Sequence, residues 1–338
     1  MSEDNKPRVI SWYRTPIDVA TLKQLHTRSD ALGLLQSLAY LAVIILTGTV
    51  AYYSGGHWPV WITVLLIFLH GTCFAFQINA VHELGHNTVF KTTWLNSLFV
   101  RIFAFLGWIN FELFNTSHAR HHRYTLHPPD DLEVVLPLHV LVKNFFQQGF
   151  LNLATTPGTP IGLIKDAVRL ARGQFRGPWE LALFPESSPD KRRPPVNWAR
   201  TLLIGHALIL VVSLSLKLWL LPVLTTFAMF YGNWLFFVCN NTQHIGLQDN
   251  VPDFRLCCRT FTLNPVVRFL YWHMNFHTEH HMYAAVPCYK LAKLHRLIRH
   301  DLPPCPQGIV ATWKQIAAIQ ETQKTNPAYQ YAAPLPTR

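Results

Sequence analysis

The sequence predicts an all-α integral membrane protein, and three observations support this prediction. Half of the 338 residues are hydrophobic and only 14% are charged, a low charged fraction for a soluble protein of this length. Four apolar runs approach the roughly 20 residues that a helix needs to cross a hydrocarbon core. Histidines gather in short clusters at the ends of these runs. We therefore expect four transmembrane helices in two hairpins, interfacial helices, and a cytoplasmic cap that carries the histidines.

The net charge and the cysteines indicate which partners and which covalent cross-links to expect. A formal net charge of +11 would also suit a nucleic-acid partner. No basic-aromatic binding motif accompanies it, so we expect no nucleic acid and assign the excess to cytoplasmic loops rich in Lys and Arg. The six cysteines show no CxxC spacing, which favours reduced thiols over a disulfide framework or a zinc knuckle.

The first hairpin follows a polar start. In residues 1–30 no apolar run follows a charged start, so we expect an uncleaved cytoplasmic N-terminal segment. Residues 31–53 are apolar over the length of one span. Residues 54–57 predict a tight uncharged turn, and the apolar run 58–80 brings the chain back. This hairpin should end on the side where it began.

The next apolar segment, residues 95–114, contains Arg101 and Glu112. A charge near the middle of a span is costly. The histidine clusters before and after this segment also reach one site only if the chain between them crosses the bilayer an even number of times. We expect an interfacial or re-entrant segment. The alternative, a full span, would place the clusters on opposite faces.

Residues 124–200 are rich in proline and basic residues, which predicts an irregular cytoplasmic loop by the positive-inside rule. Within this loop, residues 161–170 predict either a short amphipathic helix on anionic lipid or an ordinary solvated loop. Two further apolar runs, residues 201–216 and 219–238, predict a second hairpin that is broken near Lys217 and Pro222. This hairpin again returns the chain to the cytoplasmic side.

The cap follows the second hairpin. We expect residues 31–300 to form one membrane domain and residues 301–338 to form a C-terminal tail. Near the end of the cap, four basic residues predict one helix face that suits phospholipid or solvent, or the docking of an acidic partner. They are Lys290, Lys293, Arg296 and Arg299.

The histidine clusters have the spacing of metal ligands. The pattern HxxHH occurs twice, and on a helix positions i, i+3 and i+4 share one face. A third cluster, HELGH, supplies an i, i+4 pair that can chelate one ion. Eight histidines exceed what one tetrahedral ion can use, which favours two metal ions. They are His82, His86, His118, His121, His122, His277, His280 and His281.

Asn240 and His244 form an i, i+4 polar pair directly after the last apolar run. Because the other clusters converge on this side, we expect His244 to be a further ligand and Asn240 to contribute directly or through water. The other histidines are given no metal role, whether on the surface (His295 and His300) or inside apolar runs (His70 and His206).

Ligand type alone does not identify the metal, since neutral imidazoles suit iron, zinc, copper or nickel. Two ions in a largely carboxylate-free cage beside a bilayer favour an iron pair that activates dioxygen. Attack on the unactivated C–H bonds of lipids requires a redox-active metal, and zinc has no redox state to use. We therefore expect an oxidoreductase.

A zinc protease and a metal transporter are the two alternatives to an oxidoreductase. HELGH matches the HExxH pattern of zinc metalloproteases, in which Glu83 would be the general base. Such a protease needs a third ligand, typically an Asp in a later apolar segment, and residues 201–238 contain none. We expect Glu83 to orient an imidazole instead. A metal transporter should place polar ligands near the bilayer midplane, whereas these clusters lie at the ends of spans.

HELGH, HARHH, NNTQH and HTEHH, spread over four apolar runs, resemble the motifs of the membrane fatty acid desaturase and hydroxylase superfamily from about residue 30 to 300. The segments YWHMN and VPCY are similar to a branch of hydrocarbon oxygenases and acyl-lipid desaturases. The resemblance implies iron ligands at all eight clustered histidines, with His244 as the ninth and Asn240 in a water-mediated place. We expect the metal site and both termini on the cytoplasmic side of a bacterial inner membrane or endoplasmic reticulum.

The activity implied by the resemblance is the dioxygen-dependent introduction of a double bond into an acyl or other lipid chain. The alternative is a monooxygenase that hydroxylates an alkyl or terpenoid chain. The chain departs from many relatives at Ala284, where they have Pro. It also has no haem-binding HPGG, so electrons would come from a separate ferredoxin, rubredoxin or cytochrome b5 system.

Overall fold

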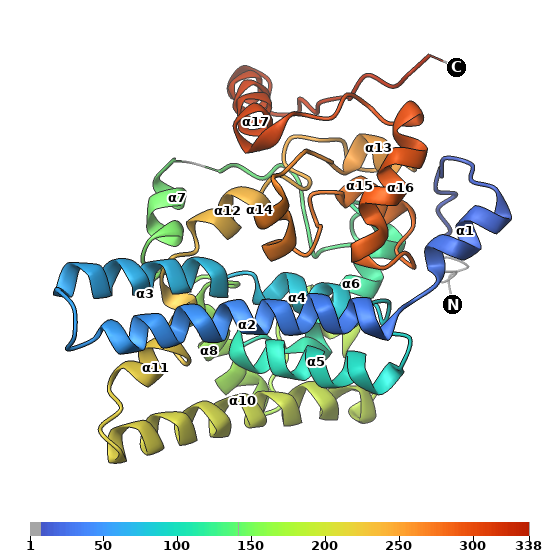
Figure 1. Cartoon of the computed structure of the whole chain (residues 1–338). Helices are drawn as coiled ribbons and strands as arrows, with labels where there is room; N and C mark the ends of the chain where they lie inside the picture. Colours follow the sequence, from blue (N-terminus) through green and yellow to red (C-terminus); the bar gives the residue numbers. More distant parts are fainter. Residues whose placement is uncertain (1–7, 141, 338) are drawn as a thin grey trace.

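The computed structural model describes residues 8–140 and 142–337, and this part of the chain is helical, with isolated β-bridges as its only extended pairings. The all-α prediction is therefore confirmed. In Figure 1 the long helices run in roughly one direction beneath a cap formed by the C-terminal third.

The helices are α1 (Val19–His26), α2 (Asp30–Ser54), α3 (Val60–Phe74), α4 (Gln77–Gly85), α5 (Thr93–Leu106), α6 (Phe111–Tyr124), α7 (Val142–Gly149), α8 (Pro160–Ala171), α9 (Gly177–Leu183), α10 (Pro189–Ser215), α11 (Leu220–Leu224), α12 (Trp234–Asn240), α13 (Phe254–Cys257), α14 (Pro265–Leu270), α15 (His277–Met282), α16 (Leu291–Ile298) and α17 (Gly308–Thr325), with 3-10 turns η1 (Ala228–Phe230), η2 (Cys288–Lys290) and η3 (Arg299–Asp301).

The first predicted hairpin is present. The Ser29 side chain caps α2 by accepting the backbone N–H of Leu32. α3 and α4 together form a second apolar stretch, Val60–Gly85, and both stretches are long and apolar enough to cross a membrane. The Tyr40 hydroxyl donates to the carbonyl of Cys73 at 3.0 Å and ties the two arms together. HELGH therefore lies at the end of the second arm.

The segment 95–114 is not one straight span, because α5 and α6 are bent by 110° at the break between them. At the break, Trp108 adopts a φ of 57° and the Asn110 side chain caps α6 by accepting the backbone N–H of Leu113. After the bend α6 returns to α4, where Asn115 lies against Gly85. This bend brings HARHH beside HELGH. The interfacial placement of the segment stays a prediction.

The second predicted hairpin is regular in one arm only. α10 is long and apolar enough to span a membrane and begins at residue 189 instead of the expected 201. The prediction of one helix over residues 219–238 is wrong, because this stretch divides into α11, η1 and α12. Pro222 has no N–H for a helical hydrogen bond. At Gly232 the backbone turns with a φ of 74° and packs so closely on α3 that a Cβ would lie 2.6 Å from the Thr72 nitrogen.

Two histidines inside apolar helices hold the irregular second arm in place. His70 in α3 lies 2.9 Å from both the Thr47 hydroxyl and the Leu224 carbonyl, through its two ring nitrogens. His206 in α10 stacks on Trp108, with ring centroids 3.9 Å apart. Both side chains are buried and hydrogen-bonded, so their role is structural and no metal role is needed.

Residues 124–200 are more regular than expected. They contain α7, α8, α9 and the start of α10. α8 covers the stretch 161–170 and packs against α10, so the helical alternative is confirmed there. Its contact with lipid stays a prediction.

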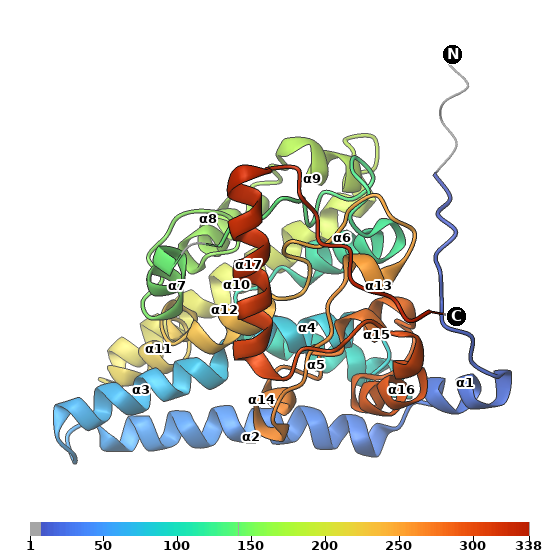
Figure 2. The same cartoon turned by 90° about the horizontal axis from the view of Figure 1, so that it is seen from above.

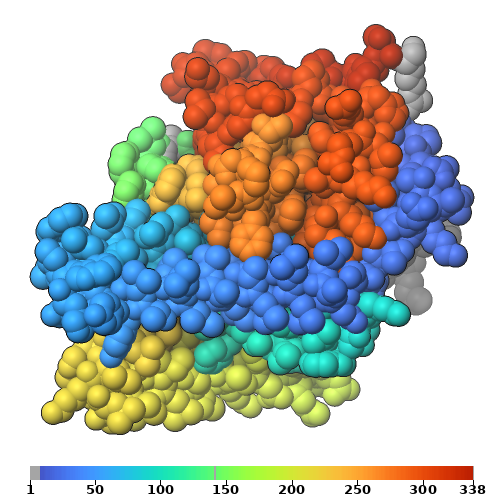
Figure 3. Space-filling model, viewed as in Figure 1, coloured from blue at the N-terminus to red at the C-terminus, as the bar shows by residue number. Residues whose placement is uncertain are grey.

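The cap formed by residues 241–325 covers one side of the first hairpin, and α10 and α11 lie on the other side (Figures 1 and 3). Figure 2, seen from above, shows the two arms α2 and α3 of this hairpin side by side. Hydrogen bonds to the Asp301 carboxylate from the hydroxyls of Tyr13, at 2.6 Å, and Thr15, at 2.7 Å, tie the N-terminal segment to this cap. The Trp313 indole N–H donates to the Val238 carbonyl at 2.9 Å and fixes α17 above α12. The cap thereby places α15, with HTEHH, over α4 and α6.

Candidate metal centre

The first of two histidine groups joins HELGH, HARHH and HTEHH. His122 Nε2 is 3.0 Å from His118 Nε2 and 3.1 Å from His280 Nε2. The rings of His82 and His118 have centroids 4.2 Å apart. One candidate ligand atom from each member lies within 4.8 Å of the others. The members are His82, His86, His118, His122 and His280.

The second group combines HTEHH with the residue that follows the second hairpin. His277 Nε2 is 3.0 Å from His244 Nε2 and 3.1 Å from His281 Nε2. The Cys258 thiol meets the same 4.8 Å limit with these three histidines. His121 lies beside this group, with its ring centroid 5.0 Å from that of His281.

The two groups adjoin, because the rings of His122 and His281 stack at 4.2 Å. α15 supplies histidines to both groups, and α6 supplies His118 and His122 to the first group and places His121 beside the second. α4 supplies histidines only to the first group. The chain therefore gathers the eight clustered histidines and His244 in one buried place.

Several of these imidazoles are held at the ring nitrogen that faces away from the group. A hydrogen bond at Nδ1 fixes the ring orientation and leaves Nε2 free to bind a metal. Three of the partners are carboxylates and two are neutral oxygens. The contacts are His82 with Glu83 (3.0 Å), His118 with Glu133 (2.7 Å), His121 with Asp131 (2.7 Å), His244 with the Cys257 carbonyl (2.8 Å) and His281 with the Thr125 hydroxyl (3.1 Å).

Glu83 lies where the sequence places it, behind an imidazole. Its carboxylate is fully buried and also lies 3.4 Å from His280 Nδ1. Asp131 and Glu133 were missed by sequence reasoning, because they lie beyond the irregular stretch that follows α6. The available signal is the acidic run DDLE eight residues after HARHH, in a chain with only 18 acidic residues.

Burial favours the uncharged form of three candidate ligands in the cap. Desolvation, followed by the effect of nearby charged groups, lowers the pKa of His244 to about 3. Desolvation and neighbouring histidines also hold the pKa values of His277 and His281 well below their usual range. The neutral imidazole is the form that binds metals. These three side chains are therefore ready to bind an ion without releasing a ring proton to solvent.

The donor set fits metal ions. His82 Nε2 and His86 Nε2 are buried without a hydrogen-bond partner, which is rare for buried polar atoms. Six other Nε2 atoms face one another at 3.0 to 3.1 Å, and each short pair can share only one proton. Positive ions between the nitrogens would satisfy all of them at once. Such imidazole sets suit iron, copper, zinc or nickel.

A family model described as "Fatty acid desaturase" matches residues 57–313, a range that includes all four histidine motifs. The chain belongs to the fatty acid desaturase family. A search of curated proteins finds no match to the chain. The predicted superfamily resemblance is therefore confirmed by the family model.

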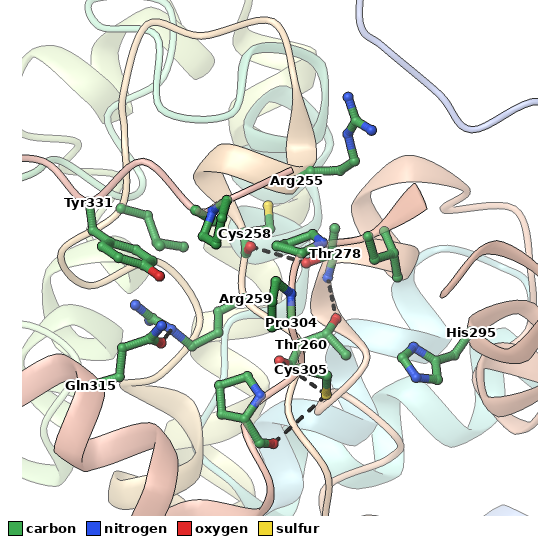
Figure 4. A pocket seen from close by; sticks show the side chains of 16 residues that line it. Arg255, Cys258, Arg259, Thr260, Thr278, His295, Pro304, Cys305, Gln315 and Tyr331 are labelled. Atoms are coloured by element: carbon green, nitrogen blue, oxygen red, sulfur yellow. Dashed lines mark hydrogen bonds between the residues drawn. The ribbon is translucent and has the colours of Figure 1, made fainter. Parts of the chain in front are cut away.

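In this member of the fatty acid desaturase family, His295 is not the surface residue that the sequence indicates. It is half-buried and its Nδ1 contacts the Glu279 carboxylate, which also accepts a hydrogen bond from the Thr260 hydroxyl. Figure 4 shows His295 and Thr260 among the side chains that line a pocket, together with Thr278 of α15. His295 therefore orients the middle residue of HTEHH. The exposed His300 is a surface residue, as expected.

Two residues near the second group need separate description. Asn240 is the last residue of α12, four residues before His244, and is half-buried. Its water-mediated role stays a prediction. Cys258, which the sequence did not single out, is buried in the second group, 3.9 Å from the Cys257 sulfur. All six cysteines are free, in agreement with the expected reduced thiols.

Proposed function

We propose that the chain is a membrane-bound, dioxygen-dependent oxidoreductase with two irons that introduces a double bond into an acyl or other lipid chain. The observation that carries the proposal is the pair of adjoining histidine groups, in which several imidazoles are already hydrogen-bonded at the outer ring nitrogen. When bound there, iron would supply the redox chemistry that activates dioxygen and removes hydrogen from an unactivated C–H bond. The proposed ligands are His82, His86, His118, His122 and His280 for one ion, and His121, His244, His277 and His281 for the other, with Asn240 acting through water.

The protein contributes orientation, charge and exclusion of water. Glu83, Asp131 and Glu133 accept hydrogen bonds at Nδ1 and fix the tautomer of three imidazoles. The Phe114 ring stacks on His118 with centroids 5.1 Å apart and covers one side of the first group. A dry, preoriented site of this kind favours reaction at a C–H bond held beside it.

Desaturation and hydroxylation both begin with removal of one hydrogen, and they differ in whether a second hydrogen leaves or oxygen is transferred to carbon. That difference depends on how the substrate is placed. Desaturation is the function that we propose, and hydroxylation of an alkyl or terpenoid chain is its alternative. The zinc protease is disfavoured because it would leave most of the gathered histidines without a role.

Electrons must reach the centre from outside, and we propose a separate ferredoxin, rubredoxin or cytochrome b5 system as the donor. The exposed basic residues Lys293 and Arg296 of α16 suit an acidic carrier. We further propose residues 31–300 as the membrane domain, between a polar N-terminal segment (1–30) and a C-terminal tail (301–338). The metal site and both termini are proposed to be cytoplasmic.

Metal content and product analysis test the function together. Purified in detergent without chelator, the protein is expected to hold close to two irons per chain, because nine histidines line the site. A host that expresses it is expected to accumulate unsaturated or hydroxylated lipid that a host expressing His281→Ala lacks. One tightly bound zinc with negligible iron would overturn the two-iron proposal and favour the protease.

A further inference from the structure

A cavity of about 330 Å³ lies between α4, α6, α8 and α10. This volume falls in the range of small-molecule sites, roughly 300–1,000 Å³. Its wall is largely apolar and includes Leu163 and Leu170 of α8, Leu202 of α10, and Met229. The cavity is thus able to hold an apolar molecule beside the long helices.

The cavity adjoins the first histidine group. Ile78 and Phe114, which line it, stand four residues before His82 and His118 on their helices, so each shares a helix face with a histidine. Ser117 and Glu133 complete this end, and the Glu133 carboxylate lies 2.7 Å from His118 Nδ1. A molecule in the cavity would therefore lie directly against the proposed centre.

The charges around the cavity are already neutralised by one another. Among the described residues that line it, Arg169 is the only basic one, beside three carboxylates. Its guanidinium donates to both Glu180 oxygens at 2.7 Å and to Asp166 at 3.1 and 3.3 Å. Arg176, just outside, also pairs with Asp166 at 2.9 Å. A negatively charged ligand would find no unpaired cation here and would face the Glu133 carboxylate.

We propose that this cavity binds the substrate as an uncharged molecule: a hydrocarbon, an alcohol or a neutral ester, and not a fatty acid anion or a phosphate-bearing thioester. Burying a carboxylate or phosphate without a partner is strongly unfavourable, whereas an apolar chain matches the leucine-rich wall. That the bound molecule is the substrate rests on the proposed function. The binding preference itself depends only on the cavity.

The test measures binding, not turnover, so it separates this proposal from the proposed function. The full-length protein in phosphatidylcholine nanodiscs is titrated with tritiated 1-dodecanol or tritiated dodecanoate at about pH 8, where the carboxyl is ionised. Empty nanodiscs give the lipid background. We expect dodecanol to bind at least about ten-fold more tightly than dodecanoate, because the anion loses its hydration without a compensating cation.

Two substitutions locate the preference in this cavity. Leu163→Trp fills the space and is expected to abolish specific dodecanol binding, whereas Val168→Trp, on the exposed face of the same helix, should leave it unchanged. Glu180→Gln removes one carboxylate from Arg169, so dodecanoate affinity should rise about ten-fold while dodecanol affinity stays the same. Glu186→Gln, at an exposed carboxylate outside the cavity, is the matched control.

Three results would overturn the proposal. The first is dodecanoate binding to the unaltered protein as tightly as dodecanol does. The second is dodecanol binding that Leu163→Trp does not change, which would place the ligand elsewhere. The third is no specific binding of either probe. A protein that shows the expected preference but forms no oxidised product would instead contradict the proposed function.

Discussion

At the scale of single residues, each candidate ligand histidine uses one ring nitrogen toward the centre and several are held by a partner at the other. The partner of His121 is Asp131, whose Oδ2 also accepts the backbone N–H of Leu126 at 2.8 Å. Its other oxygen accepts the backbone N–H of Glu133 at 2.9 Å. One buried carboxylate therefore fixes both an imidazole and the turn that carries a second carboxylate.

This arrangement predicts the effect of Asp131→Asn. An amide keeps the shape but has only one acceptor oxygen, so it cannot make all three contacts. We expect metal affinity to fall about 10- to 100-fold, the range typical for groups that orient ligands. Chelator competition followed by elemental analysis measures the change. Asp130→Asn is the control, because the Asp130 carboxylate is half-buried and forms a 3.9 Å ion pair with Arg120. An equal loss in both variants would contradict the role assigned to Asp131.

A second residue-scale prediction separates ligands from their surroundings. His244→Ala should abolish turnover and lower iron content while the protein stays folded, because it removes one Nε2 of the second group. The loss should be at least as large as the roughly 10- to 100-fold cost of an outer partner. Asn240→Ala should fall nearer that range, since water can partly replace an amide. His300→Ala, on the surface, should change almost nothing. Normal iron and activity in His244→Ala would remove the second hairpin from the ligand set.

The histidines were predictable from sequence, and their carboxylate partners were not. HELGH, HARHH and HTEHH are local patterns, because helix geometry fixes which residues share a face. The contacts of Asp131 and Glu133 depend instead on how the chain turns back after α6, and no periodic pattern determines that turn. The same holds for His295, whose neighbour Glu279 lies on a different helix.

At the scale of elements, hydrophobic length predicted the first hairpin and failed on the second. Residues 219–238 are as apolar as a span, but Pro222 and Gly232 interrupt them, and the pieces pack on α3 and α10 instead of forming one helix. Burial against other helices and burial in lipid select the same residue types. Apolar character therefore identifies the segment as buried without stating what buries it.

A substitution at Gly232 tests how closely the broken arm of the second hairpin packs on α3. Gly232→Ala would force a Cβ onto a left-handed residue, which costs about 1–2 kcal/mol, and would also press it against the Thr72 nitrogen and the Phe68 carbonyl of α3. We expect a clear drop in the thermal unfolding midpoint. Gly158 has a similar backbone angle, with a φ of 79°, but a Cβ there would meet open space. Gly158→Ala should therefore lower the midpoint only by the cost of the left-handed backbone. Equal decreases of the midpoint in the two variants would contradict the close packing of Gly232 on α3.

At the scale of the whole molecule, the bent pair α5–α6 decides whether the histidines can share one centre. The structure brings HELGH and HARHH together, so we expect both to lie on one side of the membrane that α2 and the α3–α4 stretch are long and apolar enough to cross. By the positive-inside rule, the basic residues in the loop before α10 and on α16 predict that this side is cytoplasmic. We then expect the tip between α2 and α3 to face the opposite side.

Site-directed labelling in intact membranes tests this topology. Five of the six native cysteines are buried, so a Cys305→Ser background should react little with a membrane-impermeant maleimide. His57→Cys, at the exposed tip, should label from outside. Thr116→Cys, beside HARHH, and Lys293→Cys, on α16, should label only after the membrane is opened. Labelling of Thr116→Cys from outside would mean that α5–α6 crosses the bilayer. HARHH would then lie across the membrane from HELGH, and a shared metal centre would require a different packing of α6.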